Sequence, residues 1–180
     1  MLLFLKVVIF IFFDDTKGYY SFDNLASYHQ LTVKGIDGND YVAGTGHNFR
    51  TYGGDFNEVV AGAVKIHFWG PYVTSGTTES GNINIWGLID GQTTMRSYYK
   101  FGVSSPSAVC RHVHLVTYDS FVQKWYIITG DDDADHNNFM RFTYDSVADT
   151  ITAEIIGKGG GTSIWENGGM AFAYYYSRLS

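Results

Sequence analysis

Residues 111–157, RHVHLVTYDSFVQKWYIITGDDDADHNNFMRFTYDSVADTITAEIIG, contain the same pattern twice. Residues 117–120 and 143–146 are identical Thr-Tyr-Asp-Ser tetrapeptides, and each one ends an alternating apolar run and precedes another. Alternation with a period of two is typical of strands with one buried face, and Asp-Ser is typical of turns. The stretch therefore predicts four antiparallel strands: a hairpin, an acidic loop and a second hairpin.

A second, more degenerate copy of this unit lies upstream. Its matched segments are 40–46 with 124–130, 84–91 with 138–145, and 95–102 with 150–157. The Asp turn at Asp90 thus corresponds to the one at Asp145, and residues 36–38 repeat the Ile-Asp-Gly of 89–91. A repeated four-strand unit predicts an all-β fold in which four-stranded antiparallel blades form part of a β-propeller. A β-sandwich or jelly roll is the alternative, although it would not require the repeated Asp turns.

The chain of 180 residues fits a single all-β domain that is long enough to bury a core. We expect residues 1–30 to form the outer hairpin of a preceding blade, 31–102 a blade with a long insertion at 47–82, 103–157 a blade, and 158–180 the start of a further blade. In the last segment, a glycine-rich connection leads to an apolar run, MAFAYYY, at 170–176. Because an incomplete ring leaves strand edges open, we expect a homo-oligomer or a larger assembly.

Composition excludes several classes of protein. Aromatic residues make up 17% of the chain, with 21 Gly and only 2 Pro, which favours short strands and tight turns. The net charge is −6 and Lys and Arg do not cluster, so binding to nucleic acid is not expected. Cys110 is the only cysteine, which excludes a disulfide framework and a CxxC metal site and favours a buried thiol.

The first thirteen residues, MLLFLKVVIFIFF, are apolar but too short to span a bilayer. A signal peptide is the alternative to a strand. Lys6 interrupts the run, Asp14-Asp15 follows it directly, and no small-x-small cleavage site is present. We therefore predict a buried strand that turns at 14–18 into a second strand, and no membrane span.

The order HVH-x3-YD-x5-WYIITGD, followed by an acidic loop and D-x3-DTIT, resembles the BNR/Asp-box β-propellers, which are sialidase-like. The family's hairpin signature is S-x-D-x-G-x-T-W, in which the Asp caps the turn and the Trp packs between blades. Asp90 and Thr94 keep the Asp and Thr positions, and in the second copy Asp145 survives, with residues 150–151 in place of Thr-Trp after a one-residue insertion. Signature positions that differ in the first copy are Leu88, Gln92 and Met95.

The resemblance covers residues 31–176 and implies a propeller rather than an activity, because Asp-boxes are structural. Degenerate propellers of this kind are similar to those of phage tail or fibre proteins and of secreted glycan-binding proteins. We therefore expect an extracellular or virion-associated protein.

Antiparallel blades place alternate connections at opposite ends, and one end collects residues 47–82, 103–110, 131–137 and 158–168. Long loops that carry aromatic residues are often functional, although such a loop can also merely pack on its neighbours. The candidate ligand-binding residues at this end are Trp69, Tyr72, His112, His114, Asp131, Asp133, Asp135 and Trp165.

Two groups within this set carry metal-binding chemistry. Asp131, Asp133 and Asp135 alternate and could bring hard oxygens to calcium, although a solvated acidic turn is the commoner outcome and the Gly and Glu of an EF-hand loop are missing. His112 and His114 lie two apart on a predicted strand, so their rings face one side. With a carboxylate they could bind zinc, but hydrogen-bonded packing histidines are commoner.

Catalysis is not indicated by the sequence. The sialidase resemblance would require three converging Arg, a Tyr/Glu nucleophile pair and an Asp acid/base, and Arg96 and Arg141 fall in outer strands. No G-x-S-x-G elbow is present. We therefore predict a non-catalytic recognition or structural module that binds a glycan or a protein partner through its loop face. A glycoside hydrolase fragment is the alternative, and a domain with no ligand of its own is the simplest reading.

Overall fold

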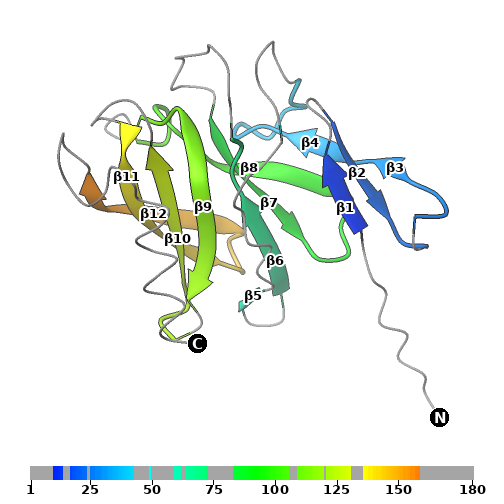
Figure 1. The fold of residues 1–180 in the computed structure, drawn as a ribbon. Helices are drawn as coiled ribbons and strands as arrows, with labels where there is room; N and C mark the ends of the chain where they lie inside the picture. The colour runs from blue at the N-terminus through cyan, green and yellow to red at the C-terminus, as the bar shows by residue number, and fades with distance from the viewer. Residues whose placement is uncertain are drawn as a thin grey trace.

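The computed structural model describes residues 10–13, 17–23, 25–42, 49, 59–61, 64–72, 83–105, 109–119, 121–130 and 136–158 (Figure 1). Within these residues the fold is all-β, as predicted, with twelve strands in three sheets and none of the sheets closed into a barrel. In the same part of the chain, no helix is long and apolar enough to cross a membrane.

Sheet C is the four-stranded sheet that the repeated tetrapeptides predict. It consists of β9 (His112–Asp119), β10 (Lys124–Gly130), β11 (Asn138–Asp145) and β12 (Thr150–Lys158), all antiparallel and in the order β12-β11-β10-β9. Each strand thus pairs with its neighbour in the chain.

The two Thr-Tyr-Asp-Ser copies close equivalent turns. Each Asp side chain accepts hydrogen bonds from the backbone N–H groups two and three residues on, at 2.8 and 3.3 Å for Asp119 and at 2.9 and 3.0 Å for Asp145. These bonds lower the pKa of the Asp145 carboxyl. The last turn residues, Gln123 and Asp149, have left-handed φ angles of 54° and 52°. The repeated Asp residues are therefore hairpin caps.

Sheet B has five strands. They are β4 (Thr32–Lys34), β5 (Val59–Ala61), β6 (Val64–Trp69), β7 (Asn84–Ile89) and β8 (Thr94–Lys100), in the order β4-β8-β7-β6-β5. Strands β5 to β8 form an antiparallel meander, and β4 adds to β8 in parallel.

Two predictions for this region are wrong. The expected loop insertion at 47–82 contains β5 and β6, because Ile66 and Phe68 on one face and Trp69 on the other all find buried positions against β7. The expected strand at 40–46 does not form over 40–42. Asp40 makes only an isolated bridge to Lys34, where the chain turns back at Gly38 with a φ of 78°. Residues 43–46 lie outside the described residues.

Sheet A consists of β1 (Phe10–Phe13), β2 (Gly18–Ser21) and β3 (His29–Gln30), all antiparallel. Phe13 pairs with Gly18, which places the turn where the sequence predicts it. Residues 1–9 lie outside the described residues. Over its described residues, the 1–30 segment therefore has three strands where a hairpin was expected.

The same irregularity occurs in sheets B and C. Asn84 pairs with Lys100 and Asn138 with Lys158, and in both sheets a β-bulge follows the next residue pair. This confirms the alignment of 84–91 with 138–145. It corrects the alignment of 95–102 with 150–157, because Lys100 corresponds to Lys158 rather than to Ile155. The hairpin of sheet C is two residues longer in each strand.

Sheet B is buried on both faces. On one face Phe68 and Ile66 join core 1, which lies between sheets B and C. On the other face Trp69 and Trp86 join core 2, against which Tyr20 of sheet A packs. The buried members of core 2 are Leu31, Phe49, Trp69, Trp86, Leu88 and Met95.

Sheets B and C contact each other through non-equivalent faces. By the shared register, Trp86 and Leu88 of β7 correspond to Met140 and Phe142 of β11. The first pair faces core 2, away from sheet C, whereas the second pair faces core 1, toward sheet B. In each sheet, the face that carries these corresponding residues therefore packs on elements that come earlier in the chain.

An aromatic cluster fills core 1. The Phe68 ring meets Tyr98, Trp125 and Tyr144 edge-on, with centroids 5.0, 5.0 and 5.7 Å apart. Gly87 lies beneath it, and a Cβ there would come within 2.5 Å of the Tyr98 ring and 2.7 Å of the Phe68 ring. The close packing of rings in core 1 thus requires glycine at this position.

Candidate functional site

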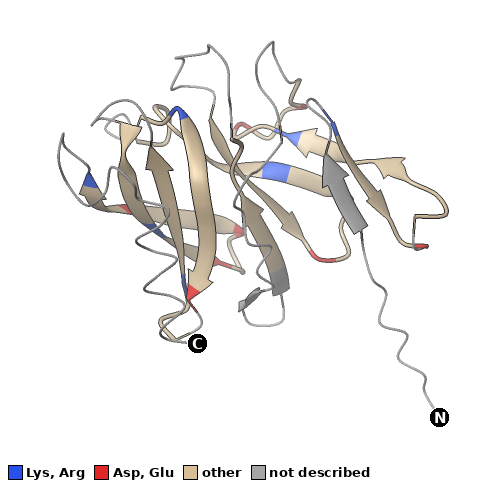
Figure 2. Ribbon diagram, viewed as in Figure 1, with Lys and Arg blue, Asp and Glu red and all other residues tan. Residues whose placement is uncertain are grey.

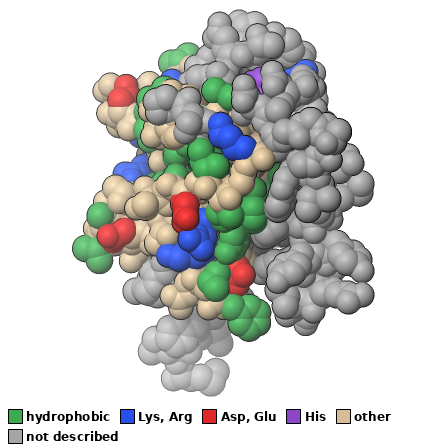
Figure 3. Space-filling model, turned by 90° about the vertical axis from the view of Figure 1, so that its left-hand side faces the viewer, with side chains coloured by type: hydrophobic (Ala, Val, Ile, Leu, Met, Phe, Trp, Pro, Cys, Tyr) green, Lys and Arg blue, Asp and Glu red, His purple; other side chains and the backbone are tan. Residues whose placement is uncertain are grey.

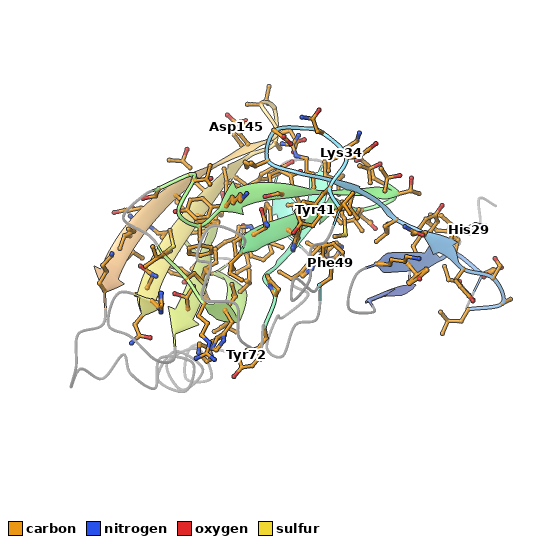
Figure 4. The ribbon with its side chains drawn as sticks, turned by 90° about the horizontal axis from the view of Figure 1, so that it is seen from above. His29, Lys34, Tyr41, Phe49, Tyr72 and Asp145 are labelled. Atoms are coloured by element: carbon orange, nitrogen blue, oxygen red, sulfur yellow. The ribbon has the colours of Figure 1, made fainter. Side chains whose placement is uncertain are left out.

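Several connections meet at one end of sheet C, which we call the loop end. His112, where β9 begins, pairs with Gly130, where β10 ends. Asn138, where β11 begins, pairs with Lys158, where β12 ends. The opposite end carries the Asp turns and is called the hairpin end. Figure 4 shows Tyr72 and Asp145 on opposite sides of the molecule.

Tyr72, His112 and His114 form an aromatic cluster at the loop end, named the Tyr-His-His cluster below. The Tyr72 ring stacks on His112 with centroids 4.2 Å apart and planes 23° apart. It meets His114 edge-on at 5.7 Å, and the two imidazoles are 4.8 Å apart. His112 is buried, whereas Tyr72 and His114 are half-buried. The two imidazoles face one side, as the sequence predicts.

The segment after β6 brings Tyr72 to this position. The backbone N–H of Val113 donates to the Pro71 carbonyl at 3.0 Å, which holds residues 70–72 against β9. A Cβ on Gly70 would come within 2.5 Å of the Val113 side chain. The cluster therefore combines one residue from the segment that follows β6 with two from β9 of sheet C.

Gly130 and Asn137 lie beside His114. A Cβ on Gly130 would be 2.6 Å from the Asn137 Oδ1 atom and 3.3 Å from the His114 Nε2 atom. Asn137 is buried. The Asn137 amide thus lies near the His114 imidazole where β10 ends. A hydrogen-bonding group therefore borders the aromatic rings of the cluster.

Asn138 fixes the residues on either side of the acidic segment 131–135. Its Nδ2 donates to the carbonyls of Val109 and His136 at 2.6 and 3.1 Å and to Thr129 Oγ1 at 3.0 Å. Thr129 Oγ1 donates to the His136 carbonyl at 2.5 Å and accepts from the Asn138 backbone N–H. This buried network ties Thr129 and His136, which flank 131–135 in the chain, to Val109 before β9.

Cys110 is a buried free thiol, as predicted. Its Sγ lies 3.2 Å from the His112 carbonyl oxygen, to which it donates. Burial raises the pKa of the thiol well above its usual value. Cys110 is therefore protonated and packed, and it is not a nucleophile candidate.

The other predicted site residues have different outcomes. Trp69 lies in β6, pairs with Trp86 and is 1% exposed, so its ring is part of core 2 and cannot serve as an exposed ligand platform. This corrects its assignment to a loop. The remaining candidates, Asp131, Asp133, Asp135 and Trp165, lie outside the described residues. Over the ranges that are described, no three His, Cys, Asp or Glu side chains gather as a metal site.

A polar cluster that the sequence does not reveal links sheets B and C at the hairpin end. The Oδ1 atom of Asp149 accepts hydrogen bonds from the hydroxyls of Tyr98 and Tyr144, at 2.7 and 2.8 Å. Its Oδ2 lies 3.0 Å from Arg96 Nη1, and Arg96 also donates to the Asp149 carbonyl. The guanidinium carbon lies 4.3 Å from the Tyr98 ring centroid.

The tyrosines of this cluster are held in the neutral form. Burial and the hydrogen bond to Asp149 raise the pKa of Tyr144 to about 12, and they also raise the pKa of Tyr98. Two neutral hydroxyls and one guanidinium satisfy a single carboxylate, which makes this cluster a structural link. The sequence signal is weak, because Asp149 looks like an ordinary turn residue and its partners lie up to 53 residues away.

Charged side chains elsewhere are dispersed over the described strands (Figure 2). Arg141 pairs with Glu154 at 2.5 Å on the exposed side of sheet C, and Lys34 pairs with Asp40 at 2.8 Å. Arg96 and Arg141 are therefore both engaged in ion pairs on strands away from the Tyr-His-His cluster.

Comparisons with protein-family models, with curated proteins and with solved structures find no match to this chain. The geometry of its own residues is therefore the basis for a functional proposal.

Proposed function

We propose that this protein is a non-catalytic recognition module that binds a glycan at the loop end, through the Tyr-His-His cluster. The observation that supports this function is the half-buried Tyr72 ring, stacked on His112 and bordered by His114. Aromatic rings pack on the apolar faces of sugars, while imidazole nitrogens and amides bind their hydroxyls. The cluster joins a connecting segment to a strand of sheet C, and binding residues are commonly carried by loops that a rigid sheet positions.

The finer architecture that we propose is a partial β-propeller with degenerate, Asp-box-like hairpins. Two antiparallel meanders, β5–β8 and β9–β12, share a bulge and a register, and sheet B is buried on both faces. A two-sheet sandwich would bury one face of each sheet. The parallel strand β4 is an addition to the four-stranded pattern. An experimental structure in which sheets A and C pack on the same face of sheet B would contradict this proposal.

We further propose that the module works in an extracellular or virion-associated assembly of several chains. The edge of β12 supports this, because its nine residues lack proline and pair only with β11 among the described strands. Light scattering coupled to size-exclusion chromatography would test it, and a monomer at all concentrations would contradict it.

A glycan array probed with the full chain, with and without calcium, tests the binding function. We expect Tyr72→Ala to weaken binding of the retained glycan about tenfold or more, equivalent to about 1.4 kcal/mol. Phe121→Ala is the matched control, because this ring is 82% exposed at the hairpin end and should have no effect. If removal of calcium and Asp133→Ala each abolished binding, we would infer that the binding site includes a calcium ion.

Three outcomes would overturn the proposal. The first is an array on which no glycan is retained, and the second is binding that Tyr72→Ala leaves unchanged. Turnover of a sialoside by the full chain would favour the glycoside hydrolase alternative instead.

A further inference from the structure

Strand β12 forms one edge of sheet C and is the longest edge strand among the described residues. It has nine residues, whereas the edge strands of sheets A and B, which are β1, β3, β4 and β5, have two to four residues each. The other edge of sheet C is β9, where Val113 donates its backbone N–H to the Pro71 carbonyl. A long edge strand offers a row of backbone N–H and C=O groups to another strand. Among the described strands, β12 is therefore the one best suited to accept such a partner.

The side chains of β12 are more exposed than those of the strand beside it. On the inner face, Met140 and Phe142 of β11 are both 0% exposed, whereas Ile155 and Ala153, which pair with them, are only half-buried against core 1. The alternate side chains from 150 to 154 lie on the outer face and are exposed. Figure 3 shows acidic and basic side chains next to one another among hydrophobic ones on this side of the molecule. Because these are the exposures in a single chain, β12 remains accessible to a second molecule.

The regular part of this edge ends at Ile155. Phe139 pairs with Gly157 and Met140 pairs with Ile155, so Ile156 is the extra residue of a β-bulge. A bulge bends its strand and interrupts regular pairing. A partner strand can therefore follow β12 over residues 150–155.

The residues of this stretch fit a second copy of the same strand. Two identical strands related by a twofold axis pair antiparallel, and each one satisfies the edge of the other, so the assembly closes at two copies. Side chains that lie directly opposite must share a face, so the axis has to pass beside a residue rather than between two residues. An axis at Glu154 would place two carboxylates opposite each other, which is unfavourable.

The remaining positions differ in what they place opposite Ile155. An axis at Thr152 would put the turn residue Asp149 there, whereas an axis at Ala153 puts the partner's Ile151 there. The second arrangement pairs apolar side chains on the inner face and leaves the small Ala153 side chains at the centre. The half-buried side chains of β12 therefore favour an axis at Ala153.

We propose that β12 pairs antiparallel with β12 of a second copy around a twofold axis at Ala153, which joins two copies of sheet C into one continuous sheet. This inference rests on the proposed assembly of several chains and identifies the partner as a second copy. On the inner face, Ile151 and Ile155 of both copies lose exposure and extend core 1. On the outer face, Thr152 lies opposite the partner's Glu154 and donates its hydroxyl to that carboxylate, which also pairs with Arg141 of its own chain.

Disulfide capture in full-length cysteine variants tests this pairing. We expect Ala153→Cys to form a linked dimer on mild oxidation, because its two copies lie directly opposite. Thr150→Cys is the matched control, since its two copies would lie about 20 Å apart along the paired strands. Thr150 is exposed and Ala153 is half-buried, so random collisions would favour Thr150→Cys, whereas docking should make Ala153→Cys cross-link at least tenfold faster. The unsubstituted chain gives the background from Cys110, which is buried.

The rates of cross-linking separate the outcomes. A rate for Thr150→Cys that equals or exceeds that of Ala153→Cys would overturn the docking, and fastest cross-linking at Thr152→Cys would overturn the register. Light scattering of the unsubstituted chain distinguishes this inference from the proposed assembly. Oligomers without capture at Ala153→Cys would refute only the β12 pairing, whereas a monomer at all concentrations would refute both.

Hydrogen exchange of the unsubstituted chain gives a readout that needs no substitution. Alternate N–H groups of an edge strand point toward its open side, and pairing protects them. We expect these amides within 150–155 to exchange at least tenfold more slowly at high protein concentration than at low concentration. The amides of β10, which lies inside sheet C, are the internal control and should not change. Exchange over 150–155 that is independent of concentration would contradict the pairing.

Discussion

At the scale of single residues, Asp149 links two sheets through one side chain. Its carboxylate accepts hydrogen bonds from Tyr98 and Tyr144 and pairs with Arg96, while its backbone holds a left-handed φ of 52°. Such a φ is unfavourable for a residue with a Cβ, so the surrounding bonds must offset its cost. Gln123 has nearly the same φ at the equivalent turn.

The two turns allow a matched test of this balance. Glycine relieves the backbone at either position, but only at Asp149 does it remove the side-chain network. We expect Asp149→Gly to lower the free energy of unfolding by about 2 kcal/mol, and Gln123→Gly to change it by less than about 1 kcal/mol. Urea unfolding midpoints measure both. An equal effect at the two positions would show that the Asp149 network contributes nothing.

The same cluster predicts a loss of stability at high pH. The pKa of Tyr144 is raised from 10.0 to about 12, mainly by burial and then by its bond to Asp149. A raised tyrosine pKa means that folding favours the neutral hydroxyl, so the stabilisation is complete below pH 10 and is lost as the pH rises through about 12. Tyr98 acts in the same direction.

Urea unfolding between about pH 9 and 12 should therefore show a falling midpoint. Tyr144→Phe removes one of the two titrating hydroxyls, so its midpoint should fall less steeply over this range. Parallel curves for the two proteins would contradict the assigned role of Tyr144.

At the scale of elements, β7 and β11 occupy corresponding places in sheets B and C but carry different residues at one key position. Gly87 of β7 lies under the Phe68 and Tyr98 rings, whereas its counterpart Arg141 of β11 pairs with Glu154 on an open surface. The residue at this position therefore reflects whether a layer packs closely on that part of the strand.

Gly87→Ala should destabilise the protein by about 1–3 kcal/mol, because the new methyl group overpacks core 1. Gly157→Ala in β12 is the matched control, since a Cβ there meets no atom within 4 Å. It should be neutral or slightly stabilising, because glycine is a poor strand residue. Thermal or urea unfolding of the two variants separates the outcomes, and a tolerated Gly87→Ala would show that core 1 is loosely packed.

At the scale of the whole molecule, the sequence predicts the local pattern well and the long-range pattern less well. The strands of sheet C and the Asp caps follow from alternation and from turn chemistry, both of which act over a few residues. The equivalence of Asn84 and Asn138 was also readable from the sequence. The strand β6 was missed although residues 64–68, VKIHF, alternate between apolar and polar, because the repeat was aligned on 40–46 and this left 64–69 inside the expected insertion.

The candidate site shows the same division. The shared orientation of His112 and His114 follows from their spacing along one strand. The position of Tyr72 depends on how residues 70–72 cross β9, and this crossing depends on the fit between Gly70 and Val113. Trp69 was misassigned for a related reason: an aromatic residue in a presumed loop looks like a ligand platform until the strand that buries it is known.

The non-equivalent faces through which sheets B and C join have an evolutionary consequence. A tandem duplication of one such unit produces a copy that already carries the surface that fits its predecessor and the surface that receives its successor. No new interface has to evolve before the longer protein can fold. Genes for such chains can therefore gain or lose whole units, while the loop end of each unit diverges under its own selection.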